Sequence, residues 1–152
     1  MKLAEALIMR ADQQRRLSSL RERLVRVAKA QEGEKALEDP AELLLEVNRV
    51  LLHLTNLMQR INRTNSSILI DEHRTLSDAL AERDALGMKR SVLNALVDAA
   101  AITHDRFSKS EIKYFATVDV QVLQKEIDGL AQAHRELDTK IQTINWTTDL
   151  AE

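Results

Sequence analysis

The sequence predicts an all-α protein, in which long antiparallel helical hairpins form a four-helix bundle-like domain. Only three glycines and one proline occur in 152 residues, so the chain has few of the residues that turns require. Hydrophobic residues make up 44% of the chain but aromatic residues only 3%, which predicts an aliphatic core. Charged residues make up 30%, as expected of helices whose outer faces are solvated.

Four segments place apolar residues at the alternating three- and four-residue spacing of a packed helix. They cover about residues 2–31, 40–65, 75–102 and 119–147. Gly33 and Asp39-Pro40 supply residues that end one helix and begin the next. The last segment has an unbroken seam from Leu123 to Ile144 in which His134 is the polar member. We expect coiled-coil packing in a single helical domain, residues 1–152.

Two short segments between the helices follow a different pattern. Residues 67–71 contain an apolar run bounded by polar residues, and residues 111–118 alternate in the period of a strand. We therefore expect two short strand-like segments. They can pair within one chain or between subunits, and we favour pairing between subunits because the two segments flank opposite ends of a long helix.

The composition excludes most common catalytic chemistry. The chain has no cysteine, which rules out disulfides, thiolate metal sites and cysteine nucleophiles. Three isolated glycines cannot form a phosphate-binding loop or a dinucleotide fingerprint. The nucleophile elbow of hydrolases and the histidine–glutamate motifs of metalloenzymes do not occur. We expect no enzyme activity, no catalytic residues, no cofactor and no metal centre; the pairs His134/Asp138 and Asp71/His73 supply only two ligands each.

Charge and hydropathy indicate which environments suit the chain. No stretch approaches the ~18 apolar residues of a membrane span, and Glu5 and Arg10 interrupt the only apolar run near the start. We expect a cytoplasmic protein without a membrane partner. The formal net charge is −2, so no overall positive field attracts nucleic acid. Seven basic residues between positions 10 and 29 could follow a phosphate backbone, but six acidic residues at 32–46 oppose them in a hairpin.

Hairpin geometry brings the polar interruptions of the first two segments together. A turn centred on residue 36 places Leu17 opposite Leu54, Leu24 opposite Val47 and Val27 opposite Leu44. The same register places Arg10 opposite Asn62 and Gln14 opposite Met58, with the start of the third segment nearby. The candidate ligand-binding or structural polar cluster is therefore Arg10, Gln14, Asn62, Arg63, Asn65, Asp78 and Glu82.

The polar cluster has two interpretations. It can bind a small ligand or anion, or it can be a self-satisfied network that fixes register and oligomeric state. We favour the network, with Arg10 paired to the carboxylate of Asp78 or Glu82, because an unpaired guanidinium beside an apolar seam is costly.

Several stretches resemble a bacterial family labelled septicolysin. They are 61–65 (INRTN), 75–84 (TLSDALAERD) and 144–148 (INWTT), together with 4–7 (AEAL) and 31–34 (QEGE). The resemblance extends over essentially the whole chain in the same order. It implies helical proteins without an established activity, although the label itself implies a cytolysin.

These observations favour a non-enzymatic, self-associating helical structural or interaction protein. A homo-oligomer is expected because Leu44, Leu51 and Met58 widen the apolar arc of the second segment beyond one partner helix. The aromatic residues gathered between Phe107 and Phe115 also suit an interface. One alternative is a small-ligand or metal-binding module that uses Arg10, Asn62 and Glu82. A further alternative is a nucleic-acid-binding helical hairpin, although we do not expect nucleic acid as a partner.

Overall fold

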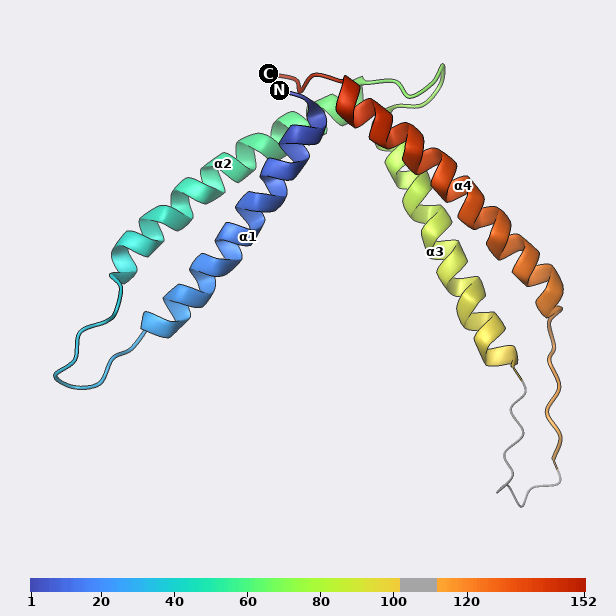
Figure 1. Cartoon of the computed structure of the whole chain (residues 1–152), viewed down its shortest axis with the longest axis horizontal. Helices are drawn as coiled ribbons and strands as arrows, with labels where there is room; N and C mark the ends of the chain where they lie inside the picture. The colour runs from blue at the N-terminus through green and yellow to red at the C-terminus, as the bar shows by residue number, and fades with distance from the viewer. Residues whose placement is uncertain (102–111) are drawn as a thin grey trace. The chain divides into compact units, whose positions relative to one another are not determined.

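The computed structural model describes residues 1–101 and 112–152, and it confirms the all-α fold class (Figure 1). The helices are α1 (Leu3–Val27), α2 (Pro40–Ser67), α3 (Leu76–Ala100) and α4 (Val120–Thr147). None of these helices, over the residues described, is long and apolar enough to cross a membrane. The chain divides into two compact units. Unit 1 is Met1–Leu76 with Gln142–Glu152, and unit 2 is Ser77–Ile141.

Helices α1 and α2 of unit 1 pack as an antiparallel hairpin (Figure 1). Their core contains Leu20, Val27, Leu43 and Val50, with Leu17, Leu24 and Val47 packed against it. The predicted seams therefore meet, but one position differs. Leu43 is 4% exposed, whereas the predicted contact Leu44 is 52% exposed. The α2 seam contains Leu43, Val47, Val50, Leu54, Leu57, Ile61 and Thr64, which keeps the alternating spacing that Leu44 would break.

At the loop end of the hairpin, α1 is shorter than predicted, whereas α2 begins where predicted. It ends at Val27, four residues before the predicted end, and Gly33 with its φ of 86° lies inside the connecting loop instead of capping the helix. Asp39 begins α2 as predicted, because its carboxylate accepts a hydrogen bond from the Ala41 N–H at 2.9 Å.

Ion pairs cross the hairpin between the basic face of α1 and the acidic segment that follows it. Arg16 donates to Glu46 through Nε at 3.0 Å and Nη2 at 2.6 Å, and Arg23 donates to both carboxylate oxygens of Glu38. These contacts are the intramolecular pairing that the opposing charge runs predict. A third basic residue, Arg15, pairs with Asp12 on its own helix.

In unit 2, side chains of α3 and α4 meet in antiparallel register. Arg83 Nη1 donates to Asp138 Oδ1 at 3.0 Å, and Lys89 pairs with Glu126. His134 is half-buried and lies on the packed seam, since a Cβ built at Gly87 would stand 3.9 Å from its Cδ2. Among the described residues of the unit, the buried apolar ones are Ala79, Ile127, Leu137 and Ile141.

The two predicted strand-like segments do not form strands in the described parts of the chain. Leu69 and Thr75 form a single antiparallel bridge, and the Leu76 N–H donates to the Ile68 carbonyl at 2.8 Å. This is a local turn between α2 and α3, and these backbone groups are paired within the chain. Residues 112–118 have no regular structure in the described part of the chain, and residue 111 lies outside that part. Alternation in sequence does not make a strand without a neighbouring strand to receive its hydrogen bonds.

Candidate functional site

Arg10 lies in the α1 seam, as the sequence predicts. The seam residues are Leu3, Ala6, Arg10, Gln13, Leu17, Leu20, Leu24 and Val27, again at alternating three- and four-residue spacing. The Arg10 side chain is half-buried, and within the described chain no acceptor binds its buried Nε–H. A buried guanidinium N–H without an acceptor costs free energy, so this atom lowers the stability of the folded seam.

The other predicted polar partners in unit 1 lie mostly outside the seam. Gln14 is exposed, and the half-buried seam residue is its neighbour Gln13. Asn62 and Arg63 are exposed and Asn65 is half-buried, whereas Thr64 is only 1% exposed. The predicted α1 seam ran through Leu7 and Gln14, whereas the packed positions are Ala6 and Gln13, one residue earlier, so Gln14 lies at the surface. On α2 the packed positions are Ile61 and Thr64, which leaves Asn62 exposed.

The two predicted acidic members of the cluster belong to unit 2. Asp78 and Glu82 are exposed on the first turns of α3, and each has a polar partner. Their pairing with Arg10 stays a prediction.

A polar network does stand at the end of unit 1, but it is built from other residues. We call it the terminal clasp, and it comprises Met1–Leu3, Thr147–Ala151, Arg60 and Thr64. The Leu3 N–H donates to the Thr148 carbonyl, and the Leu150 N–H donates to the Met1 carbonyl, both at 2.9 Å. Both ends of the described chain are therefore held together by backbone hydrogen bonds (Figure 1).

Lys2 strengthens the clasp with its side chain. Its Nζ lies 2.9 Å from Asp149 Oδ1 and donates to the Thr147 carbonyl at 3.1 Å. The second contact satisfies a carbonyl in the last turn of α4, where the helix dipole favours a positive charge. The hydrogen bond and charge of Lys2 lower the pKa of Asp149 from its ordinary value.

Thr64 and Arg60 join the last turns of α2 to the clasp. The Thr64 hydroxyl donates to the Arg60 carbonyl and accepts the Ala151 N–H, both at 2.9 Å. The Arg60 Nε donates to the Ala151 carbonyl at 2.8 Å. Thr64 follows Ile61 by three residues in the seam, so its burial was readable from the spacing, but its partner was not, because helical periodicity does not place a non-helical tail.

The clasp has the chemistry of a structural site. Its contacts are backbone hydrogen bonds, one ion pair, hydrogen bonds from the Lys2 and Arg60 side chains to carbonyls, and one buried hydroxyl. They include no nucleophile paired with a base. Within residues 1–101 and 112–152, no three histidine, aspartate or glutamate side chains are grouped to hold a metal ion.

Comparison with known proteins gives the chain a family. The model of a family of unknown function, DUF6847, matches residues 10–150. The chain belongs to this family. The crystal structure of a functionally unknown conserved protein from Corynebacterium diphtheriae is 46% identical in sequence, with a TM-score of 0.93. The match covers 99% of this chain and 98% of that chain. No curated protein matches.

The DUF6847 match corrects the family predicted from the sequence. Nothing in these comparisons indicates septicolysin, so the resemblance to that family is wrong. The stretches that suggested it are short pieces of helix and turn, such as residues 61–65 and 144–148, and none carries a catalytic motif. Such pieces are weak evidence of a family because any long polar helix offers similar ones.

Two helices of this DUF6847 protein also carry exposed apolar surfaces. The α2 face consists of Leu44, Leu45, Leu51, Leu52 and Met58, which are 52%, 57%, 41%, 76% and 43% exposed. The α3 face consists of Met88, Val92 and Leu96, with the exposed Ala85 one turn and Ala81 two turns before Met88. The wide apolar arc predicted for the second helix is thus present, and α1 covers only the part that faces it.

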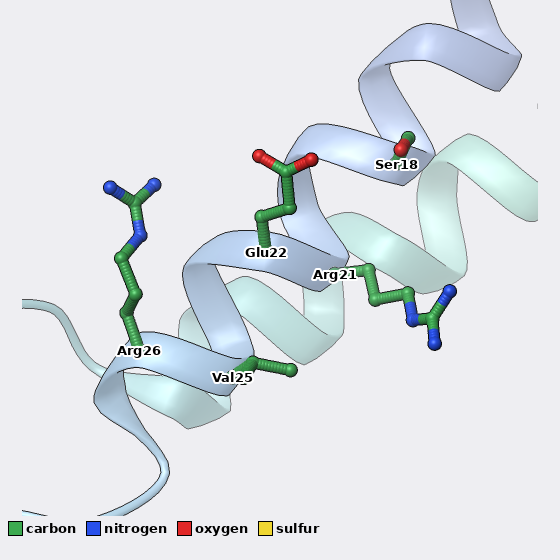
Figure 2. Close-up of a pocket in the computed structure, with 5 residues that line it drawn as sticks. All are labelled: Ser18, Arg21, Glu22, Val25 and Arg26. Atoms are coloured by element: carbon green, nitrogen blue, oxygen red, sulfur yellow. The ribbon is translucent and has the colours of Figure 1, made fainter.

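A shallow depression on α1 offers no comparable site. Its lining residues are Ser18, Arg21, Glu22, Val25 and Arg26, and all five are exposed side chains of one helix (Figure 2). No second element adds a side chain to this lining, and Figure 2 shows all five side chains extending from α1. The arrangement is open helix surface with two arginines, not a cleft that can enclose a ligand.

Proposed function

We propose that this protein is a non-enzymatic helical interaction protein that self-associates into a closed homo-oligomer. The observation that carries the proposal is the α2 face, where five large apolar side chains are exposed within fifteen residues of one helix. Single exposed leucines are ordinary. Five in one patch expose on the order of 400–500 Å², the size of the largest apolar patch on a typical soluble protein, and such a patch is often functional.

Coiled-coil packing within each hairpin belongs to the same proposal. A two-helix layer covers one stripe of each helix, so a helix with two apolar stripes needs a further partner. The alternating seams of α1 and α2 suit such packing. We also propose a cytoplasmic location, because a chain without cysteine suits a reducing compartment.

Light scattering coupled to gel filtration tests the proposal directly. We expect a mass that is a multiple of the 17.3 kDa chain at tens of micromolar protein. A mass of one chain at that concentration would contradict self-association. The exposed apolar faces would then need another protein as their partner.

A small-ligand site at Arg10 is the second candidate, and the buried Nε–H without an acceptor supports it. An anion that reached this atom would supply the missing acceptor. In that case inorganic phosphate should raise the melting temperature of the wild type more than that of Arg10→Gln. Equal shifts in the two proteins would remove this candidate.

A further inference from the structure

Resting on the proposed self-association, we propose that the partner of the α2 face is the α2 face of a second copy, packed antiparallel about a two-fold axis near Leu52. Leu52 is the most exposed member of the face and lies close to its middle, eight residues after Leu44 and six before Met58. In a two-fold interface the same patch serves both subunits, so the residues at its centre meet their own counterparts.

The charges beside the α2 face favour the antiparallel arrangement. Glu42 is exposed ten residues before Leu52, and Arg63 is exposed eleven residues after it. Neither forms an ion pair within the described residues. Antiparallel packing about Leu52 brings Glu42 close to Arg63 of the partner subunit at each end. Parallel packing would instead set Glu42 against Glu42 of the partner subunit and likewise place the two arginines together.

The polar residues within the face agree with the same register. Asn48 and Thr55 lie between the apolar positions, four residues before and three residues after Leu52. About an axis between Leu51 and Leu52, Asn48 faces Thr55 of the partner subunit, and the two side chains can share a hydrogen bond. A polar pair of this kind favours one register of helix packing over its neighbours.

The area of the face agrees with a dimer of moderate affinity. Two copies bury on the order of 1,000 Å² in total, at the lower limit of specific protein interfaces. Such an interface is sensitive to one unpaired charge at its centre, because burying that charge is costly. The flanking pairs of Glu42 with Arg63 of the partner subunit contribute to the specificity of the dimer more than to its affinity.

Charge substitutions on the two apolar faces separate this proposal from self-association in general. We expect Leu52→Glu to shift the mass from twice 17.3 kDa to 17.3 kDa, whereas Val92→Glu on the α3 face leaves it unchanged. Circular dichroism checks that both variants stay helical. A wild type that is already monomeric would refute the proposed function. If the wild type is a dimer that Val92→Glu dissociates and Leu52→Glu does not, self-association stands and only the α2 interface is overturned.

The absence of cysteine permits a test of orientation. A disulfide needs Cα atoms within about 7 Å, so a single engineered cysteine reports which residues meet across the interface. Under oxidising conditions Leu52→Cys should form a covalent dimer, and Val92→Cys should not. Glu42→Cys alone should stay uncrosslinked, whereas an equimolar mixture of Glu42→Cys and Arg63→Cys should form a mixed dimer. Efficient crosslinking of Glu42→Cys to itself would overturn the antiparallel arrangement.

Discussion

At the scale of single residues, Asp71 fastens the turn between α2 and α3. Its Oδ1 accepts the N–H groups of His73 and Arg74 at 3.2 and 3.0 Å, and its Oδ2 accepts the Arg74 Nε–H at 2.9 Å. The side-chain hydrogen bond from Arg74, followed by the backbone N–H of His73, lowers the Asp71 pKa from 3.8 to about 2. The folded chain therefore stabilises the ionised carboxylate of Asp71 relative to the unfolded chain.

The lowered pKa predicts how an Asp71→Asn variant responds to pH. A carboxyl group with a depressed folded-state pKa adds stability above its unfolded pKa of about 4 and loses it as the pH falls toward 2. We expect Asp71→Asn to melt below the wild type at neutral pH and the difference to shrink between about pH 4 and pH 2. Melting temperatures of the two proteins, recorded between pH 7 and pH 2, measure this difference. A difference that is the same at pH 7 and pH 2 would mean that the Asp71 charge is not the cause.

The residue scale is also where prediction from sequence was least accurate. Arg10 was placed on the seam correctly because it is part of the alternating spacing that starts at Leu3. Gln14, Asn62 and Leu44 were misplaced, because a shift of one residue rotates a helix position by about 100° and moves it out of the seam. Spacing identifies which apolar stripe exists, whereas the exact member of the stripe depends on the neighbouring helix.

At the scale of elements, the terminal clasp predicts a measurable role for the buried Thr64 hydroxyl. Thr64→Val keeps the shape of the side chain but leaves the Ala151 N–H without its acceptor. Losing the partner of a buried donor costs about 1–3 kcal/mol, so the variant should unfold at lower urea concentration. Hydrogen exchange at the Ala151 amide should accelerate as well.

The exposed Thr55 on the same helix supplies a matched control for Thr64. Thr55→Val removes a hydroxyl of the same size from the surface of α2 and should leave the Ala151 amide exchange unchanged. Its urea midpoint is measured at low protein concentration, where self-association does not contribute. Equal exchange rates at Ala151 in Thr64→Val and wild type would show that the hydroxyl does not hold the tail.

The helices were predictable as elements, and the clasp and the turn were not. Asp39-Pro40 identified the start of α2, and the 4-3 seam of α4 identified its whole length, because both signals are local. The clasp depends on residues more than eighty positions apart, such as Thr64 and Ala151, and nothing in helical spacing brings them together. Residues 112–118 failed for the opposite reason, since a local alternation indicated a strand where the described chain has no regular structure.

At the scale of the whole molecule, family membership and exposed surface limit function in different ways. The solved relative shares 46% of its sequence and the fold over nearly its whole length, but it is itself functionally unknown. Similarity of fold to this relative therefore assigns no function to the chain. The surface gives a separate indication, because α2 and α3 each expose a row of apolar residues, with Leu52 on α2 and Val92 on α3 among them.

Self-association through such a face should make thermal stability depend on protein concentration. If the folded state is a dimer and the unfolded state is a single chain, dilution favours unfolding by mass action. A tenfold rise in concentration then adds about 1.4 kcal/mol per dimer. Spread over the unfolding entropy of two chains, this raises the melting temperature by about 2 °C for each tenfold step.

Scanning calorimetry over a hundredfold range of protein concentration measures this dependence. The shift in melting temperature is compared with the variation among repeated scans at one concentration. Leu52→Glu is the control, because its melting temperature should not change with concentration if the α2 face forms the dimer. A wild type with a constant melting temperature would show that folding and association are not coupled. The hairpins would then be stable as single chains, and the apolar residues of the α2 face would serve contacts that form only after folding.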